Sequence, residues 1–421
     1  MKRTWWIAAC LAVLVLQAGC NPTEKTPSGN LRILNAVVDA EPLDVLVDDS
    51  VKATGITAGA TAASFDVTSG TRDVKIRSST TGAQLLDKSV SLAASAQTLV
   101  LYGHRSAIST TLLTDDTTSP SSGKFKVRVV NISPEAGAVD TYLTAGDITS
   151  SAATVSGVAA PGASDYVEVS SGSARITFTS YGTTDILFQS AARDFAAGSK
   201  VTLIVFPSAG GKLVNAVMLT TGSDGVLIPN PSARVKAVNA MADSTLLNFK
   251  GDGTTLLSNV PFTASSTYVT TAAGARVLQI EPANVPGSVM ASTSKTLDAA
   301  RDYSAIAVGS TIQPAVLVLA DENYVPTTGT ARIRFANALD SSASVDALVN
   351  FASQATGIAA RSASTYYTLT PSDSYNLTFA TSGGVSVLAT LTPAELVSGG
   401  VYTAYLLGSP AAPQARLVRD R

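Results

Sequence analysis

Groups that could carry out chemistry are sparse in this chain. Its 421 residues include one histidine and two cysteines. The histidine is His104, and the cysteines, Cys10 and Cys20, both precede residue 21. Zinc, iron–sulfur and thiol centres need clusters of cysteine and histidine, so the composition excludes them. It also excludes a disulfide framework in the body of the protein.

His104 is the one side chain that could act as the base of a Ser-His-Asp hydrolase. It follows the apolar run 99–102, where a loop is expected, and no Gly-x-Ser-x-Gly elbow accompanies it. The sequence therefore lacks the strand–turn–helix setting in which such a nucleophile works. We predict that the protein is not an enzyme, has no catalytic residue and carries no cofactor.

A polar pattern occurs four times along the chain. Each occurrence opens with a cation and closes three residues later with asparagine: Arg32 to Asn35, Arg128 to Asn131, Lys236 to Asn239 and Arg334 to Asn337. The asparagines are 96, 108 and 98 residues apart, which is about one domain length each. Strand alternation points each asparagine to the apolar face at a strand end. We expect its side chain to satisfy backbone groups of the following loop, and a repeated ligand contact is the alternative.

An acidic residue follows three of these asparagines by nine positions. The residues at this position are Asp44, Asp140, Asn248 and Asp346. Carboxylates are the ligands that calcium prefers. However, the third occurrence has lost the charge and no second acidic residue keeps a fixed offset, so we predict no metal site.

The cation and the aspartate recur together, which suggests that they pair. If residues 31–35 and 43–47 form an antiparallel hairpin, Arg32 lies opposite Asp44 on the solvent-facing side. The same offset pairs Arg128 with Asp140 and Arg334 with Asp346. We expect this cross-strand contact to set the register of the hairpin.

The repeats divide the chain into four domains, here called copies one to four. They span residues 31–118, 124–226, 232–322 and 330–421, after a tether at residues 20–30. The joints at 119–123, 229–231 and 326–329 are short and contain proline. Such joints limit bending, so we expect a semi-rigid string, on the order of 100 Å long if extended.

Each copy holds about seven short runs of alternating polarity, separated by Gly, Ser, Asn, Asp and Pro. This pattern predicts an all-β fold, with each copy an antiparallel β-sandwich of immunoglobulin-like or transthyretin-like type. One late run in each copy is almost entirely apolar, as at residues 201–206. Such a run is typical of a central strand that is buried on both faces.

The N-terminus has the features of a signal peptide over residues 1–19. Met1-Lys2-Arg3 is basic, and the apolar region from Trp5 to Leu16 is too short to span a bilayer, which needs about 20 residues. Ala18-Gly19-Cys20 resembles the lipobox of bacterial lipoproteins. That resemblance implies a lipid on Cys20, a membrane anchor and, with Asn21 following, an outer-membrane location. An ordinary secretory signal is the alternative.

The order of motifs resembles a bacterial family known only as domain of unknown function 4397. The resemblance rests on the Arg-x-x-Asn run and the Val-Asp pair that follows it, as in Arg128 to Pro134 with Val139-Asp140. Copies one and four carry the pattern too, whereas copy three has lost the Asp and the Pro. The resemblance covers nearly all of the mature chain and implies a secreted or lipid-anchored protein with no assigned activity.

The charge balance bears on possible partners. A net charge of −2 without any cluster of Lys or Arg argues against nucleic acid. The leading hypothesis is a non-enzymatic cell-envelope lipoprotein, acting as a structural spacer or as an adhesion module for a protein or glycan.

The alternative hypothesis is glycan binding by aromatic stacking in copy four. The candidate residues are Tyr366, Tyr367, Tyr375, Tyr402 and Tyr405. Tyr366 and Tyr367 are adjacent, so alternation turns them to opposite faces and at least one is expected to point outward. Ordinary packing of these rings is the competing interpretation.

Overall fold

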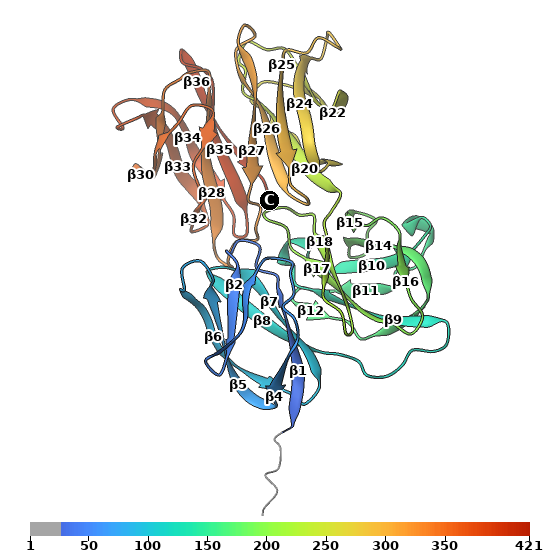
Figure 1. The fold of residues 1–421 in the computed structure, drawn as a ribbon. Helices are drawn as coiled ribbons and strands as arrows, with labels where there is room; N and C mark the ends of the chain where they lie inside the picture. Colours follow the sequence, from blue (N-terminus) through green and yellow to red (C-terminus); the bar gives the residue numbers. More distant parts are fainter. Residues whose placement is uncertain (1–26) are drawn as a thin grey trace, which may run out of the picture.

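The fold is all-β, as predicted (Figure 1). The computed structural model describes residues 27–421, so the predicted signal peptide and Cys20 lie outside the described residues. Within the described range the helical elements are two short 3-10 turns, η1 (Pro134–Ala136) and η2 (Ile148–Ser150). No helix in residues 27–421 is long and apolar enough to cross a membrane.

Copies one and three each consist of eight strands. In copy one these are β1 (Ser28–Asn35), β2 (Leu43–Val47), β3 (Ser50–Ile56), β4 (Phe65–Thr68), β5 (Gly70–Ser78), β6 (Gln84–Leu92), β7 (Ala96–His104) and β8 (Ala107–Thr114). In copy three they are β20 (Ser232–Asn239), β21 (Leu247–Gly251), β22 (Thr254–Val260), β23 (Val269–Ala272), β24 (Gly274–Pro282), β25 (Ala291–Leu297), β26 (Asp302–Gly309) and β27 (Pro314–Asp321).

Copies two and four follow the same plan with short additional strands. Copy two contains β9 (Lys124–Asn131), β10 (Val139–Thr144), β11 (Val155–Val158), β12 (Gly162–Ala163), β13 (Val167–Ser170), β14 (Gly172–Ser180), β15 (Ile186–Gln189), β16 (Arg193–Phe195), β17 (Lys200–Phe206), β18 (Asn215–Thr220) and β19 (Val226–Ile228). Copy four contains β28 (Ala331–Leu339), β29 (Val345–Val349), β30 (Ala352–Ile358), β31 (Ser362–Ala363), β32 (Tyr367–Leu369), β33 (Ser372–Thr381), β34 (Val387–Leu396), β35 (Val401–Ser409) and β36 (Ala412–Arg419).

The strand order decides between the two predicted types of sandwich. In copy one the sheets run β4-β1-β7-β8 and β3-β2-β5-β6. The first and second strands thus lie in different sheets, whereas an immunoglobulin domain pairs them in one. The first strand is central, antiparallel to β4 and parallel to β7. The same order recurs in the other three copies, so the transthyretin-like alternative is the one adopted.

Local sequence explains the tight turns of the second sheet. A two-residue hairpin of type I′ needs positive φ at both central positions, which Asp, Asn and Gly tolerate best. Asp48 and Asp49 take φ values of 48° and 62° between β2 and β3, and Asp252 and Gly253 take 49° and 81° between β21 and β22. These turns fix the register of the second sheet against the core.

Within residues 27–421, six separate apolar clusters hold the strands together. Four of them are the cores between the two sheets of each copy. The other two lie between copies: one joins the outer faces of β1 and β7 in copy one to those of β9 and β17 in copy two, and the other joins copies three and four in the same way. The late apolar strands are buried on both faces, as predicted, because the second face packs on a neighbouring copy.

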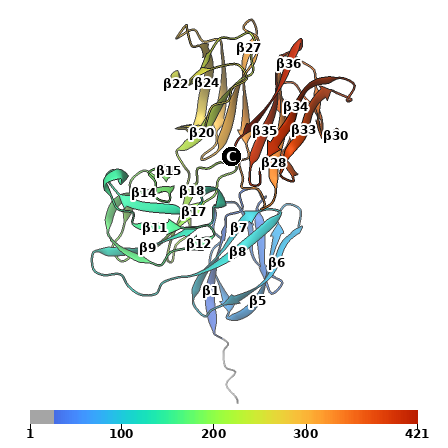
Figure 2. The ribbon, with the colours of Figure 1, turned by 180° about the vertical axis from the view of Figure 1, so that it is seen from behind.

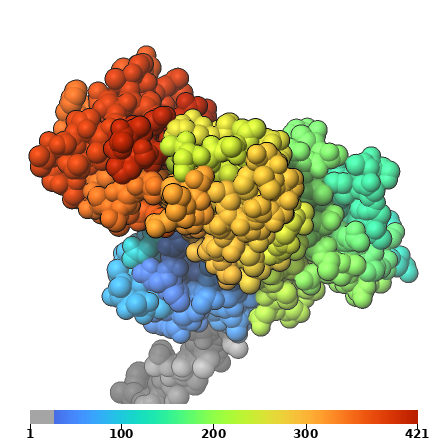
Figure 3. All heavy atoms as spheres, turned by 90° about the horizontal axis from the view of Figure 1, so that it is seen from above, coloured from blue at the N-terminus to red at the C-terminus, as the bar shows by residue number. Residues whose placement is uncertain are grey.

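The copies therefore form two tiers and not a string. Copies one and two make the lower tier (residues 27–228), and copies three and four make the upper tier (residues 232–421), as Figures 1 and 2 show from opposite sides. Viewed from above, copies three and four lie side by side over the lower tier (Figure 3). The expectation of a semi-rigid string was wrong because the outer sheet faces carry the apolar residues that make these seams.

Candidate functional site

The recurring asparagines are structural. All four are fully buried. Asn35 donates from Nδ2 to the carbonyl of Ile56 (2.8 Å) and accepts at Oδ1 from the amide of Val37 (2.9 Å). Asn131 and Asn239 repeat both contacts with their own loops. The interpretation that this side chain satisfies backbone groups is confirmed.

The predicted pairing of the recurring cation with the recurring aspartate is wrong. Arg32 lies on β1 and Asp44 on β2, and these strands belong to different sheets. Asp44 instead accepts from the amide of Gly55 (2.9 Å), and Asp346 accepts from the amides of Gly357 (2.7 Å) and Gly383 (2.9 Å).

These aspartates hold glycines that have left-handed backbone. Gly55 and Gly357 have φ values of 66° and 63°, which glycine adopts without steric cost. Among residues 27–421, no group of three or more His, Cys, Asp or Glu side chains could hold a metal ion. The position is thus a backbone clamp, which explains why Asn248 can replace the acid and still accept from the amide of Asn259 (3.0 Å).

The recurring cation points out of its own sandwich and into the seam between paired copies. The parallel register places a hydroxyl beside each one: Thr98 beside Arg32, Thr202 beside Arg128, Ser304 beside Lys236 and Thr403 beside Arg334. The three arginines donate to their threonines at 2.8–3.2 Å. All four cations are buried in these seams, and an acid lies within ion-pair distance of each one.

In the upper tier each of the two copies supplies the acid that pairs with the cation of the other. Lys236 of copy three pairs with Asp420 of copy four, and Arg334 of copy four pairs with Asp321 of copy three. Burial alone would lower the pKa of Lys236, but the carboxylate of Asp420 outweighs it and raises that pKa above its ordinary value. Burial alone would raise the pKa of Asp321, but Arg334 and Lys236 hold it below its ordinary value. Both shifts favour the charged forms of Lys236 and Asp321.

In the lower tier one carboxylate serves both cations. Asp115 lies 3.5 Å from Nη2 of Arg128 and 3.9 Å from Nη2 of Arg32. Copy two offers no acid at the corresponding place, and Arg32 donates to the carbonyls of Thr220 and Ser223 instead.

Sequence reasoning missed these acids. Asp115 directly follows β8, Asp321 ends β27, and Asp420 directly follows β36. They recur at or directly after the last strand of copies one, three and four. Their spacing from the asparagine is not constant, because loop lengths differ between copies.

The tyrosines of copy four do not form a glycan site. Tyr375, Tyr402 and Tyr405 are 9%, 4% and 0% exposed, so these three rings cannot stack on a sugar. Tyr367 packs against the core of copy four beside Phe335. Tyr366 does turn to the opposite face, as alternation predicts, but it lies in the seam under the guanidinium groups of Arg332 and Arg334.

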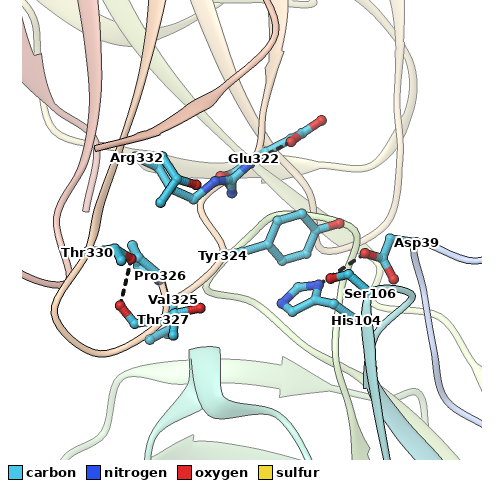
Figure 4. Close-up of a pocket in the computed structure, with 11 residues that line it drawn as sticks. Asp39, His104, Ser106, Glu322, Tyr324, Val325, Pro326, Thr327, Thr330 and Arg332 are labelled. Carbon is cyan, nitrogen blue, oxygen red and sulfur yellow. Dashed lines mark hydrogen bonds and ion pairs between the residues drawn. The ribbon is translucent and has the colours of Figure 1, made fainter. Parts of the chain in front are cut away.

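A polar cavity of about 310 Å³ lies where the two tiers meet (Figure 4). Copy one contributes Asp39 from the β1–β2 loop and His104 from the end of β7. The segment joining copies three and four contributes Tyr324, and β28 contributes Arg332. The remaining lining residues are Ser106, Glu322, Val325, Pro326, Thr327, Thr330 and Thr368. We take this cavity as the candidate functional site, because it joins residues from distant parts of the chain.

Paired charges organise the wall formed by copy one. Nδ1 of His104 lies 3.1 Å from Oδ2 of Asp39, whose Oδ1 accepts from the amide of Arg105 (2.8 Å). The hydrogen bond that His104 donates to the carboxylate of Asp39 raises the pKa of His104 above its ordinary value. Burial opposes the ionisation of Asp39, but His104 and the amide of Arg105 hold its pKa below the ordinary value.

The opposite wall is organised around Tyr324. Its ring meets that of His104 edge to face, with centroids 4.7 Å apart, and the guanidinium of Arg332 lies 5.6 Å from its centroid. Arg332 also donates to Oε2 of Glu322 (2.9 Å). Burial, with the nearby carboxylates Asp39 and Glu322, raises the pKa of Tyr324 to about 12. The phenol is therefore neutral and able to donate a hydrogen bond.

This arrangement is suited to binding. Within residues 27–421 the hydrogen-bonding partner of the His104 ring is Asp39, and no serine, threonine or cysteine hydroxyl or thiol bonds to that ring. A base without an adjacent nucleophile does not reproduce a hydrolase triad. The cavity instead offers hydroxyl groups and two planar charged pairs, which suit a small polar ligand.

The chain matches the family described as "Domain of unknown function (DUF4397)" over residues 29–142 and 233–347. No curated protein matches it.

Three solved structures give weak alignments. A family 41 carbohydrate-binding module from streptococcal virulence factors, which recognises α-glucan, aligns at 14% identity over 42% of this chain and 94% of its own, with a TM-score of 0.17. The family 26 module from Eubacterium rectale Amy13K, in complex with maltoheptaose, aligns at 14% identity over 47% and 98%, with a TM-score of 0.16. The Bacillus anthracis TIE protein aligns at 7% identity over 87% and 65%, with a TM-score of 0.16. Scores this low carry no argument about function.

Proposed function

Because the chain belongs to the DUF4397 family of domains of unknown function, we propose its function from its own architecture. The protein is a non-enzymatic interaction module of the cell envelope, attached to a membrane through a lipid on Cys20. One observation carries this proposal. Buried ion pairs and apolar seams join the copies of each tier into one body, and the free end of the upper tier lies opposite the start of β1 (Figure 1).

Several contacts support a rigid connection between the tiers. Nη2 of Arg421 donates to the carbonyl of Glu135 in copy two (3.1 Å), and the amide of Asn323 donates to the carbonyl of Gly210 in the same copy (3.1 Å). Tyr324 packs on His104 of copy one. These contacts fix the upper tier on the lower one. A rigid body of this kind could hold its far end at a fixed distance from the membrane, where a partner can bind.

The anchor and the location are tested on intact cells. A clickable palmitate analogue should label the protein, and Cys20→Ala should lose the label and leave the membrane fraction. External protease should cleave the protein without prior lysis if the upper tier is displayed outward. A protein that stays unlabelled, or that fractionates with membranes equally well after Cys20→Ala, would exclude the lipid anchor.

A second candidate function is glycan binding at the inter-tier cavity. The observation in its favour is the lining, where hydroxyl groups and the planar pairs of Asp39 with His104 and of Glu322 with Arg332 match the vicinal hydroxyls of a sugar. A glycan array probed with the purified full chain tests it. Binding should be lost in Thr368→Trp, which fills the cavity, and kept in Tyr367→Phe. The absence of any glycan signal would reject this candidate.

A further inference from the structure

The free end of copy three combines exposed apolar side chains with a cavity. We call this end the copy-three tip, formed by loops 240–246, 282–290 and 310–313. It lies beside β24 and β25 at the far end of the upper tier (Figures 1 and 3). Its exposed apolar side chains are Ile312 at 88%, Val285 at 50%, Val289 at 46% and Leu246 at 44%. Large apolar side chains gathered at one exposed end mark a contact surface.

The cavity in this tip has a volume of about 330 Å³ and an acidic edge. Leu247, Pro282 and Met290 are among the apolar residues that line it, and Asp243 is the charged residue of its lining. Asp243 accepts from the amide of Thr311 (Oδ1 3.1 Å, Oδ2 2.9 Å) and from its hydroxyl (2.7 Å). These hydrogen bonds hold its pKa below the ordinary value against the effect of burial. The cavity thus joins apolar walls to a fixed negative charge.

Copy one shows what fills the corresponding space. Gly103 and Gly309 both have positive φ at the end of the seventh strand, with values of 94° and 89°, which aligns Arg105 with Thr311. The aspartate contact is also shared, because the amide of Arg105 donates to Asp39 as that of Thr311 does to Asp243.

The side chains at these aligned positions differ. In copy one, Nε and Nη2 of Arg105 donate to the two carboxylate oxygens of Glu41 at 2.7 and 3.0 Å. Counting from Asn35 and Asn239 aligns Glu41 with Thr245. Both members of the ion pair are therefore short threonines in copy three, and both threonines line the cavity. By this alignment, the cavity is lined at the two positions where copy one carries an arginine and its partner acid.

We propose that the copy-three tip binds a protein segment that inserts an arginine or lysine side chain into this cavity. The aliphatic stem of that side chain packs on Leu247, Pro282 and Met290 while its charged head meets Asp243, as long cationic side chains do at partly apolar sites. Apolar residues flanking it in the segment pack on Ile312 and Val289. In copy one the corresponding turn residue is Ser106, which lines the cavity between the tiers and offers no apolar side chain.

The same features disfavour two other occupants. A second copy that docked as the upper tier docks on copy one would have to present groups like Tyr324 and Val325. The aligned segment of the lower tier is Thr118-Ser119, which offers neither the aromatic ring nor the apolar side chain. An anionic membrane surface would be repelled by Asp243, and the lining contains no Lys, Arg or His to attract it.

The test uses the full chain labelled with ¹³C at its methionine and isoleucine methyl groups. The probes are Ac-Leu-Arg-Leu-NH₂, its citrulline analogue, Ac-Leu-Glu-Leu-NH₂ and phosphatidylglycerol vesicles. We expect the arginine peptide to shift the methyl signals of Met290 and Ile312 saturably, and to leave that of Met218, which lies on β18 of copy two, unchanged. The citrulline and glutamate peptides should bind at least tenfold more weakly.

The matched variant gives copy three the two side chains that copy one has at the aligned positions. Thr245→Glu with Thr311→Arg should fill the cavity with the ion pair that copy one already accommodates, and should abolish the shifts while the other methyl signals keep their positions. Ile312→Ser, which copies Ser106, should weaken binding while leaving the cavity open.

Four results with the probes and the variant would overturn the proposal: no saturable shift, equal shifts with the glutamate peptide, shifts that survive the filled cavity, or binding to the vesicles in place of the peptide. Self-association of the labelled chain through the tip would overturn it as well. The inference rests on the proposed interaction function, but the two fail separately. Loss of peptide binding leaves the anchoring and protease results untouched, and loss of the anchor leaves the tip site intact.

Discussion

The buried ion pair between Arg334 and Asp321 gives the most discriminating prediction. Asp321 is fully buried and Arg334 is 3% exposed. Besides Arg334, the carboxylate of Asp321 accepts from the hydroxyl groups of Tyr268 (2.6 Å) and Ser304 (2.8 Å). We consider Asp321→Asn, which keeps the size of the side chain and removes its charge.

The expected cost follows from what the substitution leaves behind. The guanidinium of Arg334 would stay buried in the seam without its carboxylate, and one of the three donors would face an amide NH₂ group. Removing one partner of a buried ion pair costs about 3–5 kcal/mol, because the remaining charge is uncompensated. We therefore expect the substitution to lower the free energy needed to open the seam between copies three and four by about 3–5 kcal/mol.

A chain of four copies need not unfold in one step, so a single unfolding midpoint would not isolate the seam. Native-state hydrogen exchange read by mass spectrometry reports each segment separately. Backbone amides in peptides from β26, β27 and β28 should exchange faster than in the wild type. The ratio of the rates should equal the change in the opening equilibrium constant that corresponds to this loss of free energy. Peptides from β1 and β7 in the lower tier serve as the internal reference and should keep their protection.

Two further variants test the cause. Arg334→Met with Asp321→Leu replaces the pair by apolar side chains and should cost much less than Asp321→Asn alone, because no charge is left buried. Asp49→Ala, which removes an exposed partner of Lys75, should leave protection almost unchanged. The assignment of this pair to the seam between copies three and four is refuted by either of two results. One is a change in the free energy of opening of less than about 1 kcal/mol in Asp321→Asn, and the other is an equal loss of exchange protection in both tiers.

The remaining predictions concern the recurring motifs and the cavity. His104 is the sole histidine, so its one imidazole NMR signal should titrate above the ordinary value of about 6.5, and Asp39→Asn should move the midpoint down. Since the folded-state pKa is raised, the stability that His104 contributes is fully present below about pH 6.5 and is lost as the pH rises through the folded-state value. A stability difference between wild type and His104→Gln that grows with pH would contradict this sign. Asn35→Ala leaves the carbonyl of Ile56 and the amide of Val37 without their buried partner and should cost about 1–3 kcal/mol in urea unfolding; a change below that range would mean that water replaces the amide. Gly357→Ala forces a side chain into a backbone with φ of 63° and should cost about 1–2 kcal/mol, whereas Gly146→Ala, at a glycine without positive φ, should be nearly neutral in the same assay.

The candidate site was much less predictable than the fold. His104 and Asp39 lie 65 residues apart, and Tyr324 comes from a joint between two other copies. Local patterns cannot report such proximity, because it depends on how the tiers stack. The tyrosines of copy four illustrate the same limit. Their number was visible in the sequence, but the seam and the core that bury them were not.

The sequence by itself determined the repeats, the strand-rich copies and the roles of residues that act within one copy. The buried asparagine is an example, since its partners lie in its own loop and in a strand that always follows at a similar distance. The long apolar strands also predicted burial on both faces. Side chains alternate between the faces of a sheet, so a continuous apolar run places apolar side chains on both.

Only the tertiary structure decided which surface covers the second face and which acid meets each cation. The cation recurs at a fixed offset from its asparagine, but Asp321 and Asp420 belong to the partner copy and lie after loops of varying length. Sequence spacing favoured the nearer aspartate, on β2. Burial favours the carboxylates at the seam, because a cation taken out of water is stable only where an opposite charge is buried beside it.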